Sequence, residues 1–119
     1  MKDIIESEFN EHLKTSKLLP KLTDKVAICA KLCINSLKSG GKILLFGNGG
    51  SASDAQHIAA ELIGRYKVKR KGLPAIALNT DTSVITSISN DFDYINLFER
   101  QIAALANQND VVIGISTSG

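Results

Sequence analysis

The chain opens with two segments in which apolar residues recur at the spacing of one helical face. The first covers residues 2 to about 19, and the second extends to the glycine pair Gly40-Gly41, which is typical of a helix end. The apolar stripe of the first segment is Ile5, Phe9 and Leu13, and that of the second is Leu22, Val26, Cys29, Cys33 and Leu37. This spacing predicts two amphipathic helices.

After Gly41 the pattern changes, and short unbroken apolar runs alternate with further helical spacing. The runs are residues 42–46, 74–78 and 110–115. Each is too short for a helix and is typical of a strand that is buried on both faces. Between them the pattern predicts one helix over residues 51–64 and another that begins with Asp91 as its cap and ends near Leu105.

Strands that alternate with helices pair in parallel through right-handed crossovers. We therefore expect an open α/β sheet with helices on both faces, preceded by the two N-terminal helices. In such sheets ligands bind outside the carboxyl ends of the strands. The segments after Phe46, Leu78 and Ile115 are thus the places where a site is expected.

The composition fits one soluble domain and narrows the classes of partner. The chain has 119 residues, enough for one compact domain, and no repeat or linker interrupts it. Its net charge is only +2, which does not predict nucleic-acid binding, and the basic run 67–71 is interpreted as a solvated loop. Neither a membrane span nor a signal peptide is evident, so we expect a cytoplasmic protein without a membrane partner.

The two cysteines, Cys29 and Cys33, are four residues apart and share one face of the second predicted helix. Packing in the core is the favoured interpretation, since cysteine behaves as a small apolar residue. A zinc pair would need further ligands, and a secreted disulfide framework would need more cysteines.

The segment after the first predicted strand is rich in glycine and reads GNGGSASD from Gly47 to Asp54. Glycines let the backbone approach a ligand closely, and the N–H groups that begin the next helix favour an anion, most simply phosphate. Side-chain donors on Asn48, Ser51 and Ser53 favour this interpretation over a plain turn, which stays the alternative. No nucleotide cofactor is expected, because the acidic residue of a dinucleotide site and the Lys-Ser/Thr pair of a P-loop are missing.

A run of hydroxyl side chains, Ser116, Thr117 and Ser118, follows the third predicted strand. Two loops of this kind on adjacent parallel strands could hold one phosphate ester, with one loop on the phosphate and the other on the sugar. Serine and threonine are also common in turns, so the run alone carries little weight.

Farther along the helix after the glycine loop, His57 and Glu61 are four residues apart and share a face. A glutamate in a closed, partly desolvated pocket suits a base that removes a proton from carbon beside a carbonyl, which is isomerase chemistry. The pair also offers two zinc ligands, although a catalytic zinc usually takes three and no third is obvious. Without the glycine motif, Glu61 would be interpreted as a solvated residue and His57 as a structural histidine.

Five blocks of sequence together resemble the phosphoheptose isomerases, which are sugar isomerase (SIS) domain proteins. The blocks are FGNGGSASDAQH (46–57), AELIGRY (60–66), LPAIA (73–77), SNDF (89–92) and GISTSG (114–119). The resemblance implies the flavodoxin-like, three-layer SIS fold. It also implies conversion of sedoheptulose 7-phosphate to D-glycero-D-manno-heptose 7-phosphate, through an enediol, for lipopolysaccharide or capsule synthesis.

The resemblance assigns roles to residues of this chain. Glu61 would be a catalytic acid/base and a substrate contact, and His57 with Glu61 would hold zinc in members that bind it. The other substrate contacts would be Asn48, Gly49, Gly50, Ser51, Asn90, Asp91, Ser116, Thr117 and Ser118. Zinc, one ion per site with its remaining ligands beyond Gly119, is the only cofactor implied. The partners implied are a sugar phosphate and further copies of the chain, in a homotetramer packed through residues 1–40.

Family members continue past the GISTSG block with a helix, two more strands and a final helix that carries a Gln and a His, the partner acid/base. A three-stranded sheet would leave an edge and an apolar face uncovered. We therefore expect that Gly119 is not the natural end and that residues 1–119 form a single, incomplete SIS domain. Two rivals stay open. One is a scaffold that binds the replication initiator, which is expected to lack Glu61, and the other is a sugar-phosphate sensor, which would bind without turnover.

Overall fold

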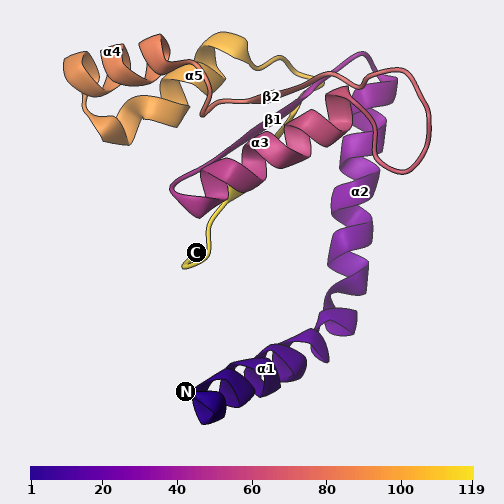
Figure 1. The fold of residues 1–119 in the computed structure, drawn as a ribbon. Coiled ribbons are helices and arrows are strands. Elements are labelled where there is room, and N and C mark those ends of the chain that lie inside the picture. The colour runs from indigo at the N-terminus through magenta and orange to yellow at the C-terminus, as the bar shows by residue number, and fades with distance from the viewer. The chain divides into compact units, whose positions relative to one another are not determined.

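The computed structural model describes all 119 residues, which form two compact units, Met1–Leu32 and Cys33–Gly119. The first unit contains α1 (Lys2–Ser16), a 3-10 turn η1 (Leu19–Leu22) and the first turns of α2 (Thr23–Lys38) (Figure 1). The second unit contains the end of α2, the sheet and the remaining helices. None of the helices is long and apolar enough to cross a membrane.

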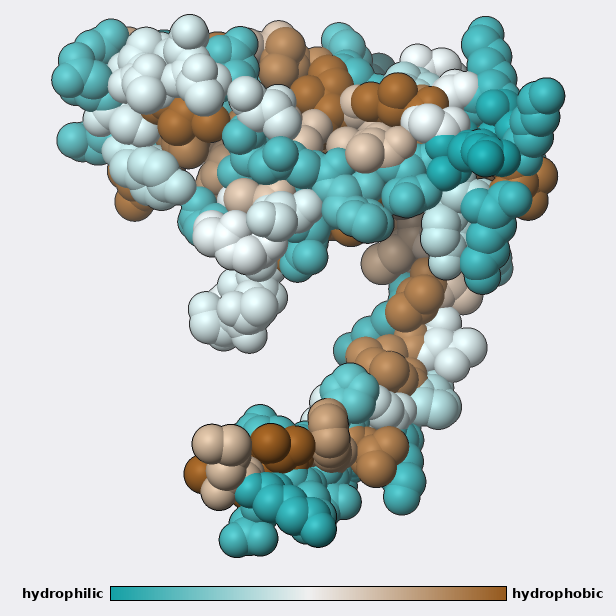
Figure 2. All heavy atoms as spheres, viewed as in Figure 1, coloured by the Kyte–Doolittle hydropathy of each residue, from teal (hydrophilic) through white to brown (hydrophobic).

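The predicted first helix is present as α1, and its apolar side chains are uncovered. No residue of α1 is buried, and Ile5, Phe9 and Leu13 are exposed by 47%, 65% and 56%. Figure 2 shows apolar (brown) and hydrophilic (teal) side chains together on the surface of the segment that Figure 1 labels α1. The helix ends at Ser16, before the predicted end, because Pro20 cannot continue an α-helix and instead sits in the first turn of η1.

The second predicted helix is α2, and only the C-terminal part of its apolar stripe is covered. Cys33 and Leu37 pack against the core of the second unit. Cys29 is exposed, so the interpretation of the cysteines as core residues is confirmed for Cys33 and wrong for Cys29 in this chain. The helix ends before Gly40, whose φ of +79° is the left-handed stop that the glycine pair predicted.

Three parallel strands form the sheet, as predicted. They are β1 (Ile43–Gly47), β2 (Ala75–Ala77) and β3 (Val111–Ile115), in the order β2-β1-β3. The chain leaves β1 on one side to reach β2 and then crosses to the other side to reach β3. The direction of winding therefore reverses between β1 and β3, which is where ligands bind in sheets of this kind.

Helices lie on both faces of the sheet, α3 (Gly50–Ile63) along one and α5 (Leu97–Leu105) at Phe46 on the other, so the predicted fold class is confirmed (Figure 1). The α3 side holds a core made of Ile43, Leu45, Ala55, Ala59, Ala75 and Ala77. On the α5 side the ring centroids of Phe46 and Phe98 lie 4.6 Å apart. There the buried Gln101 donates from Nε2 to the carbonyl of Leu78, at 3.1 Å.

A helix that the apolar pattern did not predict, α4 (Thr82–Phe92), precedes the short 3-10 turn η2 (Tyr94–Asn96). Its N-cap is Asp81, whose carboxylate accepts a hydrogen bond from the N–H of Val84 at 3.0 Å. The prediction that Asp91 caps a helix is wrong, because Asp91 lies in the last turn of α4. This helix is rich in Ser, Thr, Val and Ile, which are weak helix formers, so its sequence favoured no element.

The basic loop 67–71 is not only a solvated loop, since Arg70 caps the end of α3. Its guanidinium donates to the carbonyls of Glu61 and Leu62, both at 2.8 Å. A cation at a helix C-terminus satisfies free carbonyls and interacts favourably with the helix dipole. The loop therefore fixes the end of α3 that carries Glu61.

Candidate functional site

The carboxyl ends of β1 and β3 lie side by side. Gly47, the last residue of β1, is in register with Ile115, the last residue of β3. The glycine-rich loop that follows β1 and the hydroxyl run that follows β3 therefore leave the sheet at neighbouring positions. This is the juxtaposition that a ligand shared by the two loops would need.

Close approaches and left-handed backbone account for the glycines of the first loop. A Cβ at Gly47 would lie 2.6 Å from the Cβ of Ser51 and 2.8 Å from the carbonyl oxygen of Ile115, so no larger residue fits. Gly49 has a φ of +58°, in the region that favours glycine. A Cβ at Gly50, where α3 begins, would have no atom within 4 Å. The N–H groups of Ser51 and Ala52 donate to the carbonyls of Asn48 and Gly49, both at 3.1 Å, so the N–H of Gly50 and the positive end of the helix dipole are what this open surface offers to an anion.

Asn79, for which the sequence predicts no role, holds the end of β1 through its side-chain amide. Its Nδ2 donates to the carbonyl of Gly47 at 2.7 Å, and its Oδ1 accepts from the N–H of Gly47 at 3.3 Å. This side-chain amide takes the place of a further residue of β2 beside β1. It fixes the peptide from which the glycine loop departs.

A second unexpected contact holds the side chain of Asn48. Its Oδ1 accepts a hydrogen bond of 2.6 Å from the hydroxyl of Tyr94, which is 46 residues farther along the chain, in η2. The predicted substrate contacts Asn90 and Asp91 lie in the last turn of α4, where Asn90 Nδ2 donates to Asp91 Oδ1 at 2.8 Å. Neither residue forms a hydrogen bond with the glycine loop, so the hydrogen bond between this part of the chain and the loop is the one from Tyr94 to Asn48.

The hydroxyl run after β3 forms an exposed turn. Ser116 Oγ accepts a hydrogen bond from the N–H of Gly119 at 3.0 Å, which closes the turn around Thr117 and Ser118. The hydroxyls of Thr117 and Ser118 make no hydrogen bond within the chain. They are therefore available to a ligand beside the glycine loop.

His57 and Glu61 share one face of α3, as predicted, and lie away from the glycine loop. His57 Nε2 is 3.7 Å from Glu61 Oε1, and their side chains are 77% and 39% exposed. Glu61 follows Gly50 by 11 residues, which is about 16 Å along a helix axis. The chain by itself does not enclose Glu61 in the closed pocket that was expected. No third His, Cys, Asp or Glu joins the pair into a group that could hold a metal ion.

Comparison with protein families agrees with this geometry. The family model described as "SIS domain" matches residues 9–119. The chain belongs to the SIS-domain family. The match begins within α1 and includes the glycine loop, α3 and the hydroxyl run, so it covers every predicted site residue.

Individual SIS-domain relatives are similar along the whole chain. The phosphoheptose isomerase of Helicobacter hepaticus is 56% identical over 119 residues, which are 100% of this chain and 61% of that protein. That of Aliarcobacter butzleri is 53% identical over 120 residues, 100% of this chain and 64% of that protein. The structure of phosphoheptose isomerase from Neisseria gonorrhoeae matches with a TM-score of 0.90 at 40% identity, over 98% of this chain and 60% of that chain. The resemblance seen in the sequence is confirmed, and the chain spans about three fifths of the length of these relatives.

Of the two unexpected residues at this SIS-domain site, Asn79 is indicated by the sequence and Tyr94 is not. Asn79 follows the second predicted strand directly, at a position where a site was expected, so its place along the chain was a usable signal. Tyr94 carried no such signal, because its role depends on a contact with Asn48 across 46 positions.

Proposed function

We propose that this SIS-domain protein is an aldose-ketose isomerase that converts sedoheptulose 7-phosphate to D-glycero-D-manno-heptose 7-phosphate, for heptose in lipopolysaccharide or capsule. The observation that carries the proposal is the glycine loop, open beside Gly50, next to the hydroxyl run of β3. The identity of 56% and 53% to proteins named phosphoheptose isomerase supports this choice of substrate.

The phosphate of the substrate would bind at the start of α3. There the N–H of Gly50 and the positive end of the helix dipole favour an anion, while the N–H groups of Ser51 and Ala52 already donate to the carbonyls of Asn48 and Gly49. Asn48 Nδ2 would add a side-chain donor, and Thr117 and Ser118 would donate from the facing turn. The hydroxyls of these two residues make no bond within the chain, so binding would break no hydrogen bond of theirs.

Glu61 would act at the other end of the substrate. The phosphate on C7 and the reacting carbons C1 and C2 are at opposite ends of the sugar. The extended sugar phosphate is shorter than the separation of about 16 Å between Gly50 and Glu61 along α3, so the Glu61 side chain would have to reach back toward the glycine loop. A site of this length also suits a boundary between subunits, where a second copy would supply the walls that one chain leaves open around Glu61. Such a boundary would remove Glu61 from water.

The proton transfer would proceed in two steps. In the first, the Glu61 carboxylate takes a proton from C1 of the ketose. The electron pair of that C–H bond becomes the C1–C2 double bond of the enediol, and the carbonyl oxygen on C2 gains a proton from a second acid. In the second, Glu61 returns its proton to C2 while the hydroxyl on C1 gives its proton to the second acid, which is thereby restored, and becomes the aldehyde. We infer that the second acid is a His, the residue that the resemblance implies for this role.

The His57–Glu61 pair fits part of a zinc site. An imidazole nitrogen and a carboxylate oxygen are ordinary zinc ligands, and these two atoms lie 3.7 Å apart on one helix face. We infer that the pair holds a zinc ion together with further ligands that complete the site. When bound, zinc would polarise the carbonyl of the substrate.

The exposed face of α1 supports a homotetramer. Ile5, Phe9 and Leu13 are about half or more exposed, and no residue of α1 is buried within the chain. Apolar stripes of this kind are buried against another element in stable proteins. We propose that the N-terminal helices of several copies cover each other.

Assay of the full-length protein with sedoheptulose 7-phosphate tests the proposed function. Glu61→Gln should lower kcat by about 100-fold or more, because it removes a general base. Glu99→Gln is a matched control, since Glu99 is exposed on α5 and has no hydrogen-bond or ion-pair partner. Binding of inorganic phosphate should be unchanged in both variants.

The outcomes distinguish the proposal from its rivals. Near-normal turnover by Glu61→Gln would remove the role of Glu61. Binding of the sugar phosphate by the wild-type protein without any product would favour a sensor. Neither binding nor turnover would favour a scaffold.

A further inference from the structure

We propose that Tyr94 is a positioning residue that holds the amide of Asn48 with its Nδ2 donors presented to the oxygen atoms of a sugar phosphate. The inference rests on the proposed function, because it concerns the same site. The observation behind it is the 2.6 Å hydrogen bond that the Tyr94 hydroxyl donates to Asn48 Oδ1.

The direction of this hydrogen bond sets what Asn48 offers to a ligand. A side-chain amide has an acceptor end and a donor end, and rotation of its last torsion by half a turn exchanges them at little cost. The hydroxyl of Tyr94 engages the acceptor end, so the two N–H bonds of Nδ2 are directed elsewhere. An anionic ligand needs donors. With the Tyr94 hydroxyl as donor, Asn48 therefore keeps both of its N–H bonds for an oxygen-rich ligand.

A second contact holds the segment of Tyr94 over the end of β1. Phe98, four residues after Tyr94, packs its ring on that of Phe46 with centroids 4.6 Å apart. Phe46 is two residues before Asn48, and the two contacts therefore join the same pair of segments. Leu97, which lies between Tyr94 and Phe98 in the sequence, is 1% exposed and anchors this segment in the interior. Tyr94 is thus presented by a fixed support.

The turn before Tyr94 is held in a conformation that is unusual for its residue. Asp93 has φ +69° and ψ +149°, close to a region that is almost restricted to glycine. The N–H of Asn96 donates to the carbonyl of Asp93 at 3.1 Å, and its Nδ2 donates to the carbonyl of Phe92. The guanidinium carbon of Arg100 lies 3.7 Å from the centre of the Phe92 ring. These contacts maintain a strained turn that directs Tyr94 toward Asn48.

The hydroxyl of Tyr94 is not needed to fill the interior. Tyr94 is 55% exposed, so removal of its hydroxyl leaves no cavity and no buried polar group without a partner. Tyr94→Phe should therefore separate an effect on Asn48 from an effect on folding. The other tyrosine, Tyr66, is 61% exposed and its hydroxyl has no hydrogen-bond partner, which makes Tyr66→Phe a matched control.

The test is a double-mutant cycle in the full-length protein with Tyr94→Phe, Asn48→Ala and the double variant. Calorimetry measures the affinity for sedoheptulose 7-phosphate and, separately, for inorganic phosphate. Tyr94→Phe should weaken both by about 3- to 10-fold, the range of one hydrogen bond. Asn48→Ala should weaken them at least as much, and the double variant should bind no more weakly than Asn48→Ala. In turnover, Tyr94→Phe should raise KM and leave kcat nearly unchanged.

Each other result has a defined meaning. If the wild-type protein does not bind the sugar phosphate, the proposed function itself is wrong. If the wild type binds and Tyr94→Phe binds equally well, the positioning role is wrong and the proposed function stands. Effects of Tyr94 and Asn48 that multiply in the double variant would also overturn the role, because Tyr94 would then act on the ligand without Asn48. A melting temperature lowered in Tyr94→Phe and unchanged in Tyr66→Phe would instead assign Tyr94 to folding.

Discussion

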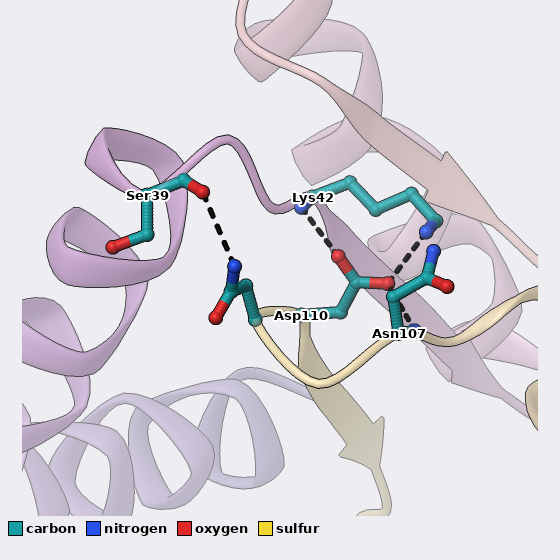
Figure 3. A network of polar contacts seen from close by, with 5 residues as sticks. Ser39, Lys42, Asn107 and Asp110 are labelled. Carbon is teal, nitrogen blue, oxygen red and sulfur yellow. Dashed lines mark hydrogen bonds and ion pairs between the residues drawn. The ribbon is translucent and has the colours of Figure 1, made fainter.

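Lys42 and Asp110 are joined by an ion pair with 2.5 Å between Nζ and Oδ2, although they are 68 positions apart in the chain (Figure 3). The same carboxylate accepts from the N–H of Lys42 at 2.8 Å and from the N–H of Asn107 at 2.7 Å. Lys42 directly precedes β1 and Asp110 directly precedes β3. The pair therefore aligns the starts of the two strands whose opposite ends carry the glycine loop and the hydroxyl run.

This pair makes stability depend on pH in the acid range. The pKa of Asp110 is lowered from 3.8 to about 2, chiefly by the hydrogen bond from the Lys42 side chain. Burial opposes this shift, and the hydrogen bonds from the N–H groups of Asn107 and Lys42 add to it. The folded state then binds the proton more weakly than the unfolded state. The contribution to stability is complete above about pH 4 and is lost as the pH falls through about 2.

Denaturant unfolding of the wild type and of Asp110→Asn at several pH values measures this dependence. Asp110→Asn should be less stable near neutral pH, and the difference should narrow as the pH falls from about 4 to about 2. Asp3→Asn, on the exposed surface of α1, is the control and should show no such trend. A difference between wild type and Asp110→Asn that stays constant over this range would contradict the assignment.

The two hydrogen bonds between the Asn79 side chain and the Gly47 peptide should lose their stabilising effect when only the Nδ2 donor is removed. Asn79→Asp keeps an acceptor for the N–H of Gly47 but places a carboxylate oxygen against its carbonyl, in place of the 2.7 Å bond. We expect the free energy of unfolding to fall by about 1 to 3 kcal/mol. Asn35→Asp, exposed in the last turn of α2 and without a hydrogen-bond partner for its side chain, should lower the free energy of unfolding by about 0.3 to 1 kcal/mol through the helix dipole alone. If the two substitutions lower the free energy of unfolding equally in denaturant unfolding, the hydrogen bonds between Asn79 and Gly47 contribute nothing to stability.

The sequence predicts the parts of this fold whose signals are local. The buried strands appear as apolar runs and α3 as a spaced apolar stripe, because each is determined by which of its own residues face the core. The sequence does not predict α4, because its Ser, Thr, Val and Ile residues have low helix propensity and its N-cap Asp81 is the one local signal. Tertiary contacts of α4 with η2 and α5 outweigh that propensity.

The same distinction applies to the candidate site. The glycine loop and the hydroxyl run are each contiguous in sequence, so neighbouring residues are enough to indicate their chemistry. The contacts of Tyr94 with Asn48 and of Asn79 with Gly47 each join residues 30 or more positions apart, and no periodicity encodes such pairs. Arg70 was interpreted as solvated for the same reason, because its carbonyl partners on α3 become neighbours only after folding.

The turn at Asp93 should become more stable with glycine. Its φ of +69° is unfavourable for a residue with a Cβ, so Asp93→Gly should raise the free energy of unfolding by about 1 kcal/mol. Asp93→Ala removes the carboxylate and keeps the Cβ, and it should give no such gain. Thermal unfolding of the three proteins provides the comparison. If alanine stabilised as much as glycine, the carboxylate rather than the backbone would be the source of strain.

Gly47 and Gly50, at the two ends of the glycine loop, should respond in opposite ways to substitution by alanine. At Gly47 the new Cβ would lie 2.6 Å from the Cβ of Ser51 and 2.8 Å from the carbonyl oxygen of Ile115, so Gly47→Ala should destabilise the fold by about 1 to 3 kcal/mol. At Gly50 the new Cβ would have no atom within 4 Å apart from its chain neighbours and the backbone of α3, so Gly50→Ala should leave the melting temperature unchanged or raise it slightly. Its Cβ would nevertheless stand on the surface proposed for phosphate, and the affinity for inorganic phosphate should fall. Unchanged affinity in Gly50→Ala would place the anion elsewhere, and a fully stable Gly47→Ala would contradict the close approach of β1 to the start of α3.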